Sequence, residues 1–276
     1  MTDFVARGSI VRRIWGNVDM VLLVFAGSAA EFALSRAVDW LFFTGKVPND
    51  PMGRLFATAR YAQEIVFADE LTASATLRRI RAAHQVIERR RGETIPDWAH
   101  RDVLYMLIHY SERAHELLVR RLTIAERNEL YDVFYRVGMG LGISDLPRGY
   151  AEWRIDRERH LHRDLIHGDF TDALYAAYRR QLGPWRYRLL LLAQSMLVPT
   201  HVRALLRMKP VELLRPALRL HPLLAHAGLS PVIQRLLIPP QHLGSVHALN
   251  QRKPGVMTYN VPHPLRRGNE ARCSVR

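Results

Sequence analysis

The sequence contains almost no cysteine, the residue that forms disulfide frameworks and thiolate metal sites. It contains one cysteine, Cys273, close to its last residue. A single cysteine excludes an intrachain disulfide network and any zinc or iron–sulfur site held by several cysteines. A reducing, cytoplasmic location is therefore the default expectation, and association with a membrane is the alternative.

Long hydrophobic runs are also lacking. The most apolar stretch, MVLLVFAGSAA at 20–30, lies between Asp19 and Glu31 and is shorter than a membrane-spanning helix requires. It shares some features with the apolar part of a signal peptide, which also has small residues after an apolar core. The flanking carboxylates favour a helix of the protein core.

Glycine-rich phosphate loops and a G-x-S-x-G turn are missing, which argues against a nucleotide enzyme or a serine hydrolase. Alternating strand patterns are missing too, whereas hydrophobic periods near 3.6 recur over long stretches without helix breakers. The sequence therefore predicts an all-α fold of about eight or nine helices. Turn residues predict helix breaks in 44–51, 90–98, 142–149, 167–172, 181–186 and 197–200.

The length of 276 residues, with 48% hydrophobic side chains, is enough for a substantial core. We expect one large helical domain over 1–208. Short leucine-rich pieces interrupted by prolines predict a helical extension packed on it over 209–250. The basic segment 251–276 lacks periodicity and is predicted to be disordered.

Basic residues outnumber acidic ones, with 40 Lys and Arg against 26 Asp and Glu and a formal charge of +14. Such a surface attracts anions, including phospholipid headgroups and carboxylate-bearing cofactors. No zinc finger, RNA-binding aromatic signature or bZIP heptad accompanies the charge, so we expect no nucleic-acid partner.

His84 is the most informative single residue. At the angular spacing of an α-helix it falls on an apolar stripe whose members are Ala73, Leu77, Ile80, His84 and Ile87. A buried neutral imidazole needs a partner for its ring nitrogens. A hydrogen bond within the core and a metal ion both satisfy that need, and the pattern alone leaves both open.

Two polar residues share one face of the otherwise apolar stretch DPMGRLFATARY at 50–61. Arg54 and Thr58 lie one helical turn apart. A guanidinium that reaches to water and a hydroxyl bonded to its own helix explain the pair without any ligand. A bound group that requires polar contacts on this face is the other explanation.

A second histidine cluster carries less weight. Glu112 and His115 have the Glu-x-x-His spacing of di-iron bundles, but no second copy of that motif occurs. Four polar residues of the same segment form one stripe: Tyr105, His109, Glu112 and Glu116. We interpret this stripe as a solvated face. His160, His162 and His167 occur among charged residues, and we expect them at the surface.

Several blocks occur in a specific order. They are DPMGRLFATARY (50–61), IVFADE (65–70), RRIRAAH (78–84) and the stretch from DVLYML to YAEW (102–153). In this order the chain resembles, over 10–205, the family that joins the fungal oxygenase MpaB to the bacterial latex-clearing rubber oxygenases. The resemblance implies a globin-like helical core, haem b as cofactor, and use of dioxygen to cleave carbon–carbon double bonds in hydrophobic substrates.

The matched positions imply roles for individual residues. His84 matches the residue that binds the haem iron, and Arg54 and Thr58 match the polar, catalytic pair that lines the haem pocket. Ala57 stands where rubber-cleaving relatives have a lysine, and 31–40 lacks the His-Pro pair of many relatives. A distal carboxylate acts as base in that family, and either Glu31 or Asp39 could take its place here.

The sequence thus predicts a haem b-dependent oxidoreductase, an oxygenase or peroxygenase that uses dioxygen or peroxide on an apolar, isoprenoid or lipid-like small molecule. The alternative is a non-catalytic, membrane-peripheral helical protein without haem chemistry. Its basis is the net charge together with the apolar, basic and aromatic stretch 185–209, which has the composition of an interfacial anchor. An ordinary buried helix is the other interpretation of that stretch.

Overall fold

The computed structural model describes residues 2–43, 49–211, 235 and 237–250. These residues form eleven α-helices, eight of them with seven or more residues, and one 3₁₀ turn. Two isolated β-bridges, Asp3 with Asp69 and Ser35 with Leu165, take the place of strands in the described chain. The predicted all-α fold is confirmed, and the three shortest helices account for the larger helix count. A globin-like topology stays a prediction.

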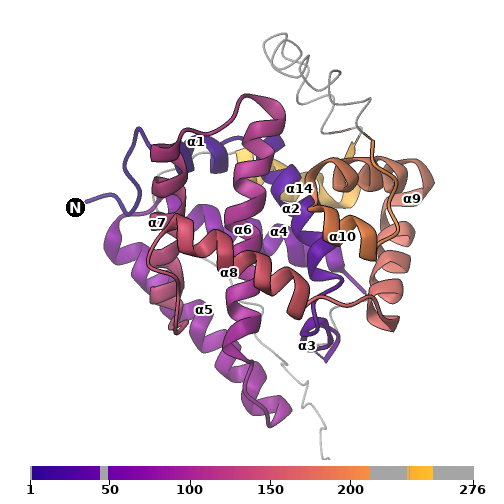
Figure 1. The fold of residues 1–276 in the computed structure, drawn as a ribbon, viewed down its shortest axis with the longest axis horizontal. Helices are drawn as coiled ribbons and strands as arrows, with labels where there is room; N and C mark the ends of the chain where they lie inside the picture. Colours follow the sequence, from indigo (N-terminus) through magenta and orange to yellow (C-terminus); the bar gives the residue numbers. More distant parts are fainter. Residues whose placement is uncertain (1, 44–48, 212–234, 236, 251–276) are drawn as a thin grey trace, which may run out of the picture.

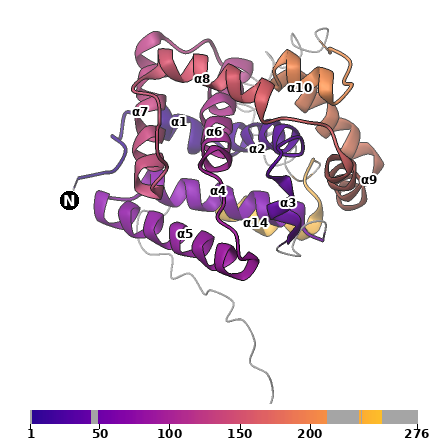
Figure 2. The ribbon, with the colours of Figure 1, turned by 60° about the horizontal axis from the view of Figure 1, so that its bottom comes forward.

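The helices follow one another along the chain in this order. They are α1 (Ile10–Trp15), α2 (Val18–Phe32), α3 (Val38–Phe43), α4 (Pro51–Phe67), α5 (Glu70–Arg91), α6 (Asp97–Leu118), α7 (Ile124–Leu141), α8 (Tyr150–Arg163), α9 (Asp169–Leu197), α10 (Thr200–Leu205), the 3₁₀ turn η2 (Pro240–His242) and α14 (Leu243–Asn250). In Figure 2, α4 and α5 form one layer, α2 and α6 lie in the middle, α8 covers the far side, and α7 runs along one flank from α8 to α5.

The core centres on α2 and α6, which pack along each other (Figure 1). Gly27 makes their close approach possible, because a Cβ at this position would lie 2.2 Å from the ring of Tyr110. The apolar stretch 20–30 falls within α2 and is mostly buried, so the predicted core helix is confirmed. None of the helices in the described residues is both long and apolar enough to cross a membrane.

A helical hairpin formed by α4 and α5 makes up the layer that carries the predicted site. Asp50 caps α4 by accepting from the amide of Gly53 at 2.8 Å, and Asp69 caps α5 by accepting from the amide of Thr72 at 2.9 Å. Gly92 ends α5 with a φ of 76°, which is favourable for glycine. The short link between the helices makes them antiparallel neighbours.

The predicted breaks at 90–98, 142–149, 167–172 and 197–200 all separate helices. The one at 181–186 falls inside α9 and is confirmed as well, because Gly183 leaves the helical conformation there, with a φ of 71° and a ψ of 172° next to Pro184, and divides α9 into two helical parts. The segment 44–48 and the tail 251–276 lie outside the described residues, and the domain boundary at 208 stays a prediction. Beyond it, α14 packs against α4 and α2.

The interpretation of the α6 stripe as a solvated face was wrong. Tyr105 is fully buried and donates to Asp156 of α8 at 2.7 Å, and Glu112 is buried and accepts from the hydroxyl of Tyr150 at 2.9 Å. The stripe faces α7 and α8, which supply ionic and hydrogen-bonding partners. His160 is also buried, contrary to the expectation, because Asp164 binds its Nδ1 at 2.7 Å. His162 and His167 are exposed as predicted.

Candidate functional site

Arg54 and His84 lie on the two arms of the α4–α5 hairpin, at nearly the same distance along the chain from its turn. The antiparallel arrangement therefore brings the first part of α4 level with the second part of α5. Both side chains are half-buried. The charge of Arg54 acts on His84 strongly enough to contribute to the pKa of the imidazole.

The predicted apolar stripe of α5 is confirmed in its first half, where Ala73 and Leu77 are buried. Further along, Ile80, His84 and Ile87 are half-buried. The ring of His84 lies 4.9 Å from that of His100, centroid to centroid, with 33° between the planes. His100 comes from the first turns of α6 and was not identified from the sequence, because no spacing connects it to His84.

The pKa of His84 is lowered to about 4, mainly by burial and to a smaller extent by the neighbouring His100 and Arg54, while Glu88 opposes them. Burial lowers the pKa of His100 as well. At neutral pH the His84 imidazole is therefore uncharged, with one ring nitrogen carrying a free lone pair. That is the protonation state in which histidine binds a metal.

Arg54 contributes a positive charge without a carboxylate partner among residues 2–43 and 49–211. Burial lowers the pKa of its guanidinium, which nonetheless stays charged near neutrality. A desolvated cation of this kind favours an anion at the same place. Its position beside a neutral imidazole gives the hairpin one cationic and one metal-binding group.

Thr58 lies one turn after Arg54, and its hydroxyl donates to the carbonyl oxygen of Arg54 at 3.1 Å. This local bond is common for threonine in a helix and by itself indicates no ligand. The hydroxyl oxygen still has lone pairs with which to accept a hydrogen bond.

The two candidates for a distal carboxylate have different surroundings. Glu31 is fully buried, forms a two-point ion pair with Arg157 of α8, and accepts from the hydroxyl of Tyr110 at 2.8 Å. Asp39 of α3 binds Arg91 at 2.7 Å. Because Arg91 follows His84 by two helical turns, Asp39 lies on the side of α5 that carries His84. Asp39 is thus connected to the second half of α5, whereas Glu31 is connected to α6 and α8.

The described residues contain no group of three or more His, Cys, Asp or Glu side chains arranged for a metal ion. A metal centre held by side chains alone is therefore unsupported in this part of the chain. A haem iron makes a smaller demand, because the porphyrin supplies four nitrogen ligands and the protein supplies one or two. Neutral His84 with the cationic Arg54 beside it fits a haem, whose propionates are anionic.

No curated protein matches the chain. The family model described as "ER-bound oxygenase mpaB/B'/Rubber oxygenase, catalytic domain" matches residues 11–237, which include the whole hairpin and α6. Because the match spans most of the sequence, the chain belongs to the catalytic-domain family of the mpaB and rubber oxygenases.

Proposed function

We propose that the protein is a haem b-dependent oxygenase that acts on an apolar small molecule. Membership of the family points to an oxygenase. Support for the haem comes from one observation. A neutral imidazole and a guanidinium with no carboxylate partner among the described residues lie on facing arms of the α4–α5 hairpin.

In this proposal one ring nitrogen of His84 ligates the iron, and its other N–H donates to an acceptor. Glu88, one turn further along α5, is the carboxylate whose charge acts on His84, and we assign it that acceptor role. Arg54 binds a propionate or a small anion, and Thr58 accepts a hydrogen bond in the same pocket. The bound haem supplies the activation of dioxygen or peroxide.

The substrate we propose is apolar, isoprenoid or lipid-like, and smaller than polyisoprene. Ala57 lies on α4 between Arg54 and Thr58, and a methyl group cannot act as a proton donor or a distal ligand. General acid–base assistance contributes about 10²–10⁴-fold to a rate. The missing ammonium therefore favours slower or redirected chemistry over efficient rubber cleavage.

Absorption spectroscopy of the purified, haem-supplemented protein tests the cofactor. We expect a Soret band in the wild type, its loss in His84→Ala with unchanged far-UV helicity, and its retention in the matched control His162→Ala, which removes an exposed histidine of α8. Retention in His84→Ala with loss in His100→Ala would transfer the ligand role to His100. A wild-type protein that binds no haem would overturn the proposal.

A second candidate is a non-catalytic protein that binds membrane surfaces. It is favoured by α9, where Trp185 and Leu189 are 39% and 38% exposed beside Arg186 and Arg188. Sedimentation with anionic vesicles, combined with a visible spectrum that stays featureless after haem supplementation, would support this candidate over the oxygenase.

A further inference from the structure

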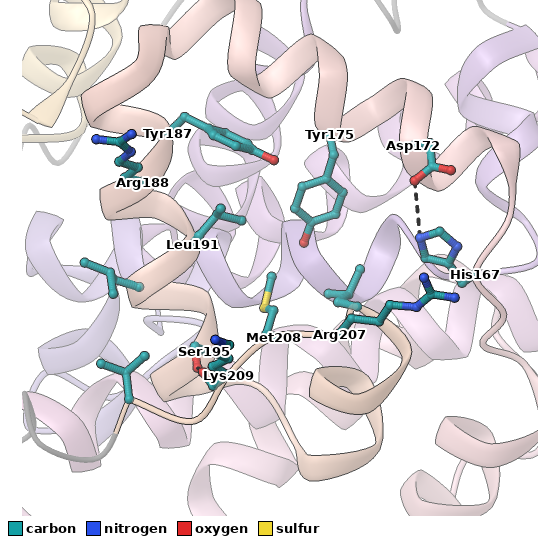
Figure 3. Close-up of a pocket in the computed structure, with 13 residues that line it drawn as sticks. His167, Asp172, Tyr175, Tyr187, Arg188, Leu191, Ser195, Arg207, Met208 and Lys209 are labelled. Carbon is teal, nitrogen blue, oxygen red and sulfur yellow. Dashed lines mark hydrogen bonds and ion pairs between the residues drawn. The ribbon is translucent and has the colours of Figure 1, made fainter.

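A cavity of about 640 Å³ lies between α9 and the segment that follows α10 (Figure 3). Arg54, Thr58 and His84 do not line it, so it is separate from the hairpin site. Its volume falls within the range of about 300–1,000 Å³ that is usual for small-molecule sites.

Three cations lie on the wall of this cavity: Arg188 on α9, and Arg207 and Lys209 after α10. The one acidic side chain of the wall, Asp172, is already paired with His167 at 3.3 Å. Within the described ranges no carboxylate pairs with any of the three cations. The cavity therefore has an excess of positive charge that attracts an anion.

The rest of the wall is apolar and aromatic. The rings of Tyr175 and Tyr187 and the side chains of Leu191 and Met208 point toward the interior (Figure 3). Tyr175 is held in place because its hydroxyl donates to Gln194 at 3.0 Å, and the amide of Gln194 donates to the carbonyl of Ala26 at 3.1 Å. A hydrocarbon chain can lie against such a surface and leave water.

The backbone that carries two of the cations is fixed as well. Ser195 donates to the carbonyl oxygen of Lys209 at 2.6 Å, which attaches this segment to α9. Arg207 has a φ of 52°, a conformation that side chains other than glycine rarely adopt. Cations held on such a backbone lose less freedom when they bind an anion than cations on a mobile loop do.

We infer that this cavity binds a single-chain amphiphile whose headgroup is anionic. The headgroup contacts Arg207 and Lys209, the two cations of the segment after α10, and the chain lies between the tyrosine rings and Leu191 (Figure 3). Carboxylate and phosphate headgroups share this chemistry, so a fatty acid and an alkyl phosphate are both ligands of the proposed class.

Isothermal titration of the full chain with four probes tests the inference: dodecanoate, dodecyl phosphate, dodecanol and inorganic phosphate, all below the micellar concentration. We expect the two anionic amphiphiles to bind, dodecanol to bind at least tenfold more weakly, and inorganic phosphate to give no measurable heat. The stronger of the two anions identifies the natural headgroup.

Variants locate the binding. Arg207→Gln combined with Lys209→Gln should weaken dodecanoate binding at least tenfold, whereas the matched control Arg180→Gln, an exposed arginine of α9 outside the wall, should leave it unchanged. Equal weakening by the control, binding of dodecanol as tight as that of dodecanoate, or no binding of either anion to the folded wild type would each overturn the inference. The same titrations with haem-free and haem-loaded protein show whether amphiphile binding depends on haem, so the two proposals can fail independently.

Discussion

The buried ion pair between α2 and α8 gives the sharpest stability prediction. The guanidinium of Arg157 meets both carboxylate oxygens of Glu31, with Nη2 at 2.6 Å from Oε2, and the two side chains are 5% and 0% exposed. Replacement of Arg157 by Met keeps the volume roughly constant but leaves Glu31 charged and unpaired in the core. Loss of one partner of such a pair costs about 3–5 kcal/mol in the free energy of unfolding.

A second carboxyl group, Asp102, interacts with the same ion pair. Asp102 is buried, neither of its oxygens has a hydrogen bond of good geometry in the described residues, and burial raises its pKa to about 8. Arg157 lowers the pKa of Asp102 and Glu31 raises it. At pH 7 Asp102 is therefore mostly protonated, and loss of Arg157 alone leaves Glu31 as the unpaired charge. The double change Glu31→Leu with Arg157→Met removes both charges together and should recover most of the stability.

Urea unfolding followed by far-UV circular dichroism at pH 7 measures the four members of this cycle. Tyr110→Phe serves as a milder probe that remains folded, with an expected loss of about 1.5–3 kcal/mol for one hydrogen bond to a charged group. A loss below about 1 kcal/mol in Arg157→Met, or additive losses in the double variant, would refute the reasoning, because groups in direct contact should couple.

The remaining predictions concern other sites. Because the folded-state pKa of Asp102 lies above the unfolded value, its contribution to stability is complete below about pH 4 and is lost as the pH rises toward 8. The urea midpoint of the wild type relative to that of Asp102→Asn should therefore fall over this interval, and a constant difference would contradict this. Gly27→Ala should lower the unfolding free energy by about 1–3 kcal/mol through its clash with the Tyr110 ring, and a normal Tm would contradict that. Arg54→Leu should keep a histidine-bound haem but weaken haem retention and azide affinity by an amount equivalent to roughly 1.5–3 kcal/mol, which spectral titration against Arg60→Leu checks. Because Ala57 stands where rubber-cleaving relatives have a lysine, we expect little carbonyl-ended product when the haem-loaded protein is incubated with polyisoprene latex under air. Robust product formation would show that the lysine is unnecessary.

Local pattern was enough to predict the helices and the apolar stripe of α5 that carries His84. It also placed Arg54 and Thr58 on one face of α4, because helical spacing depends on residues near each other in the sequence. Their role in a site came from the family resemblance and stays a prediction. His100 could not be found this way, because its approach to His84 depends on how α6 crosses the end of α5.

The buried polar stripe of α6 shows a second limit. A row such as Tyr105 and Glu112 has the same helical spacing whether it faces water or faces partners on other helices. Only the tertiary arrangement supplies Asp156 and Tyr150. Similarly, the link between α6 and α7 contains neither glycine nor proline, so no turn signal marked the end of α6 at Leu118.

The burial of α5 decreases along its length, and this decrease affects how a flat ligand could enter the hairpin. Its first part is anchored by Ala73, Thr76 and Leu77, and after Leu77 no residue of α5 is buried. The first half of α5 is thus fixed in the core, whereas the second half, which carries His84, has no buried residue that holds it there. Separating this end from α4 would break few core contacts, so insertion between the arms would leave the α2–α6 centre intact. Amide hydrogen exchange should accordingly rise along α5 from Ala73 toward Arg91 in the ligand-free protein, and saturation with haem should slow it selectively in the second half.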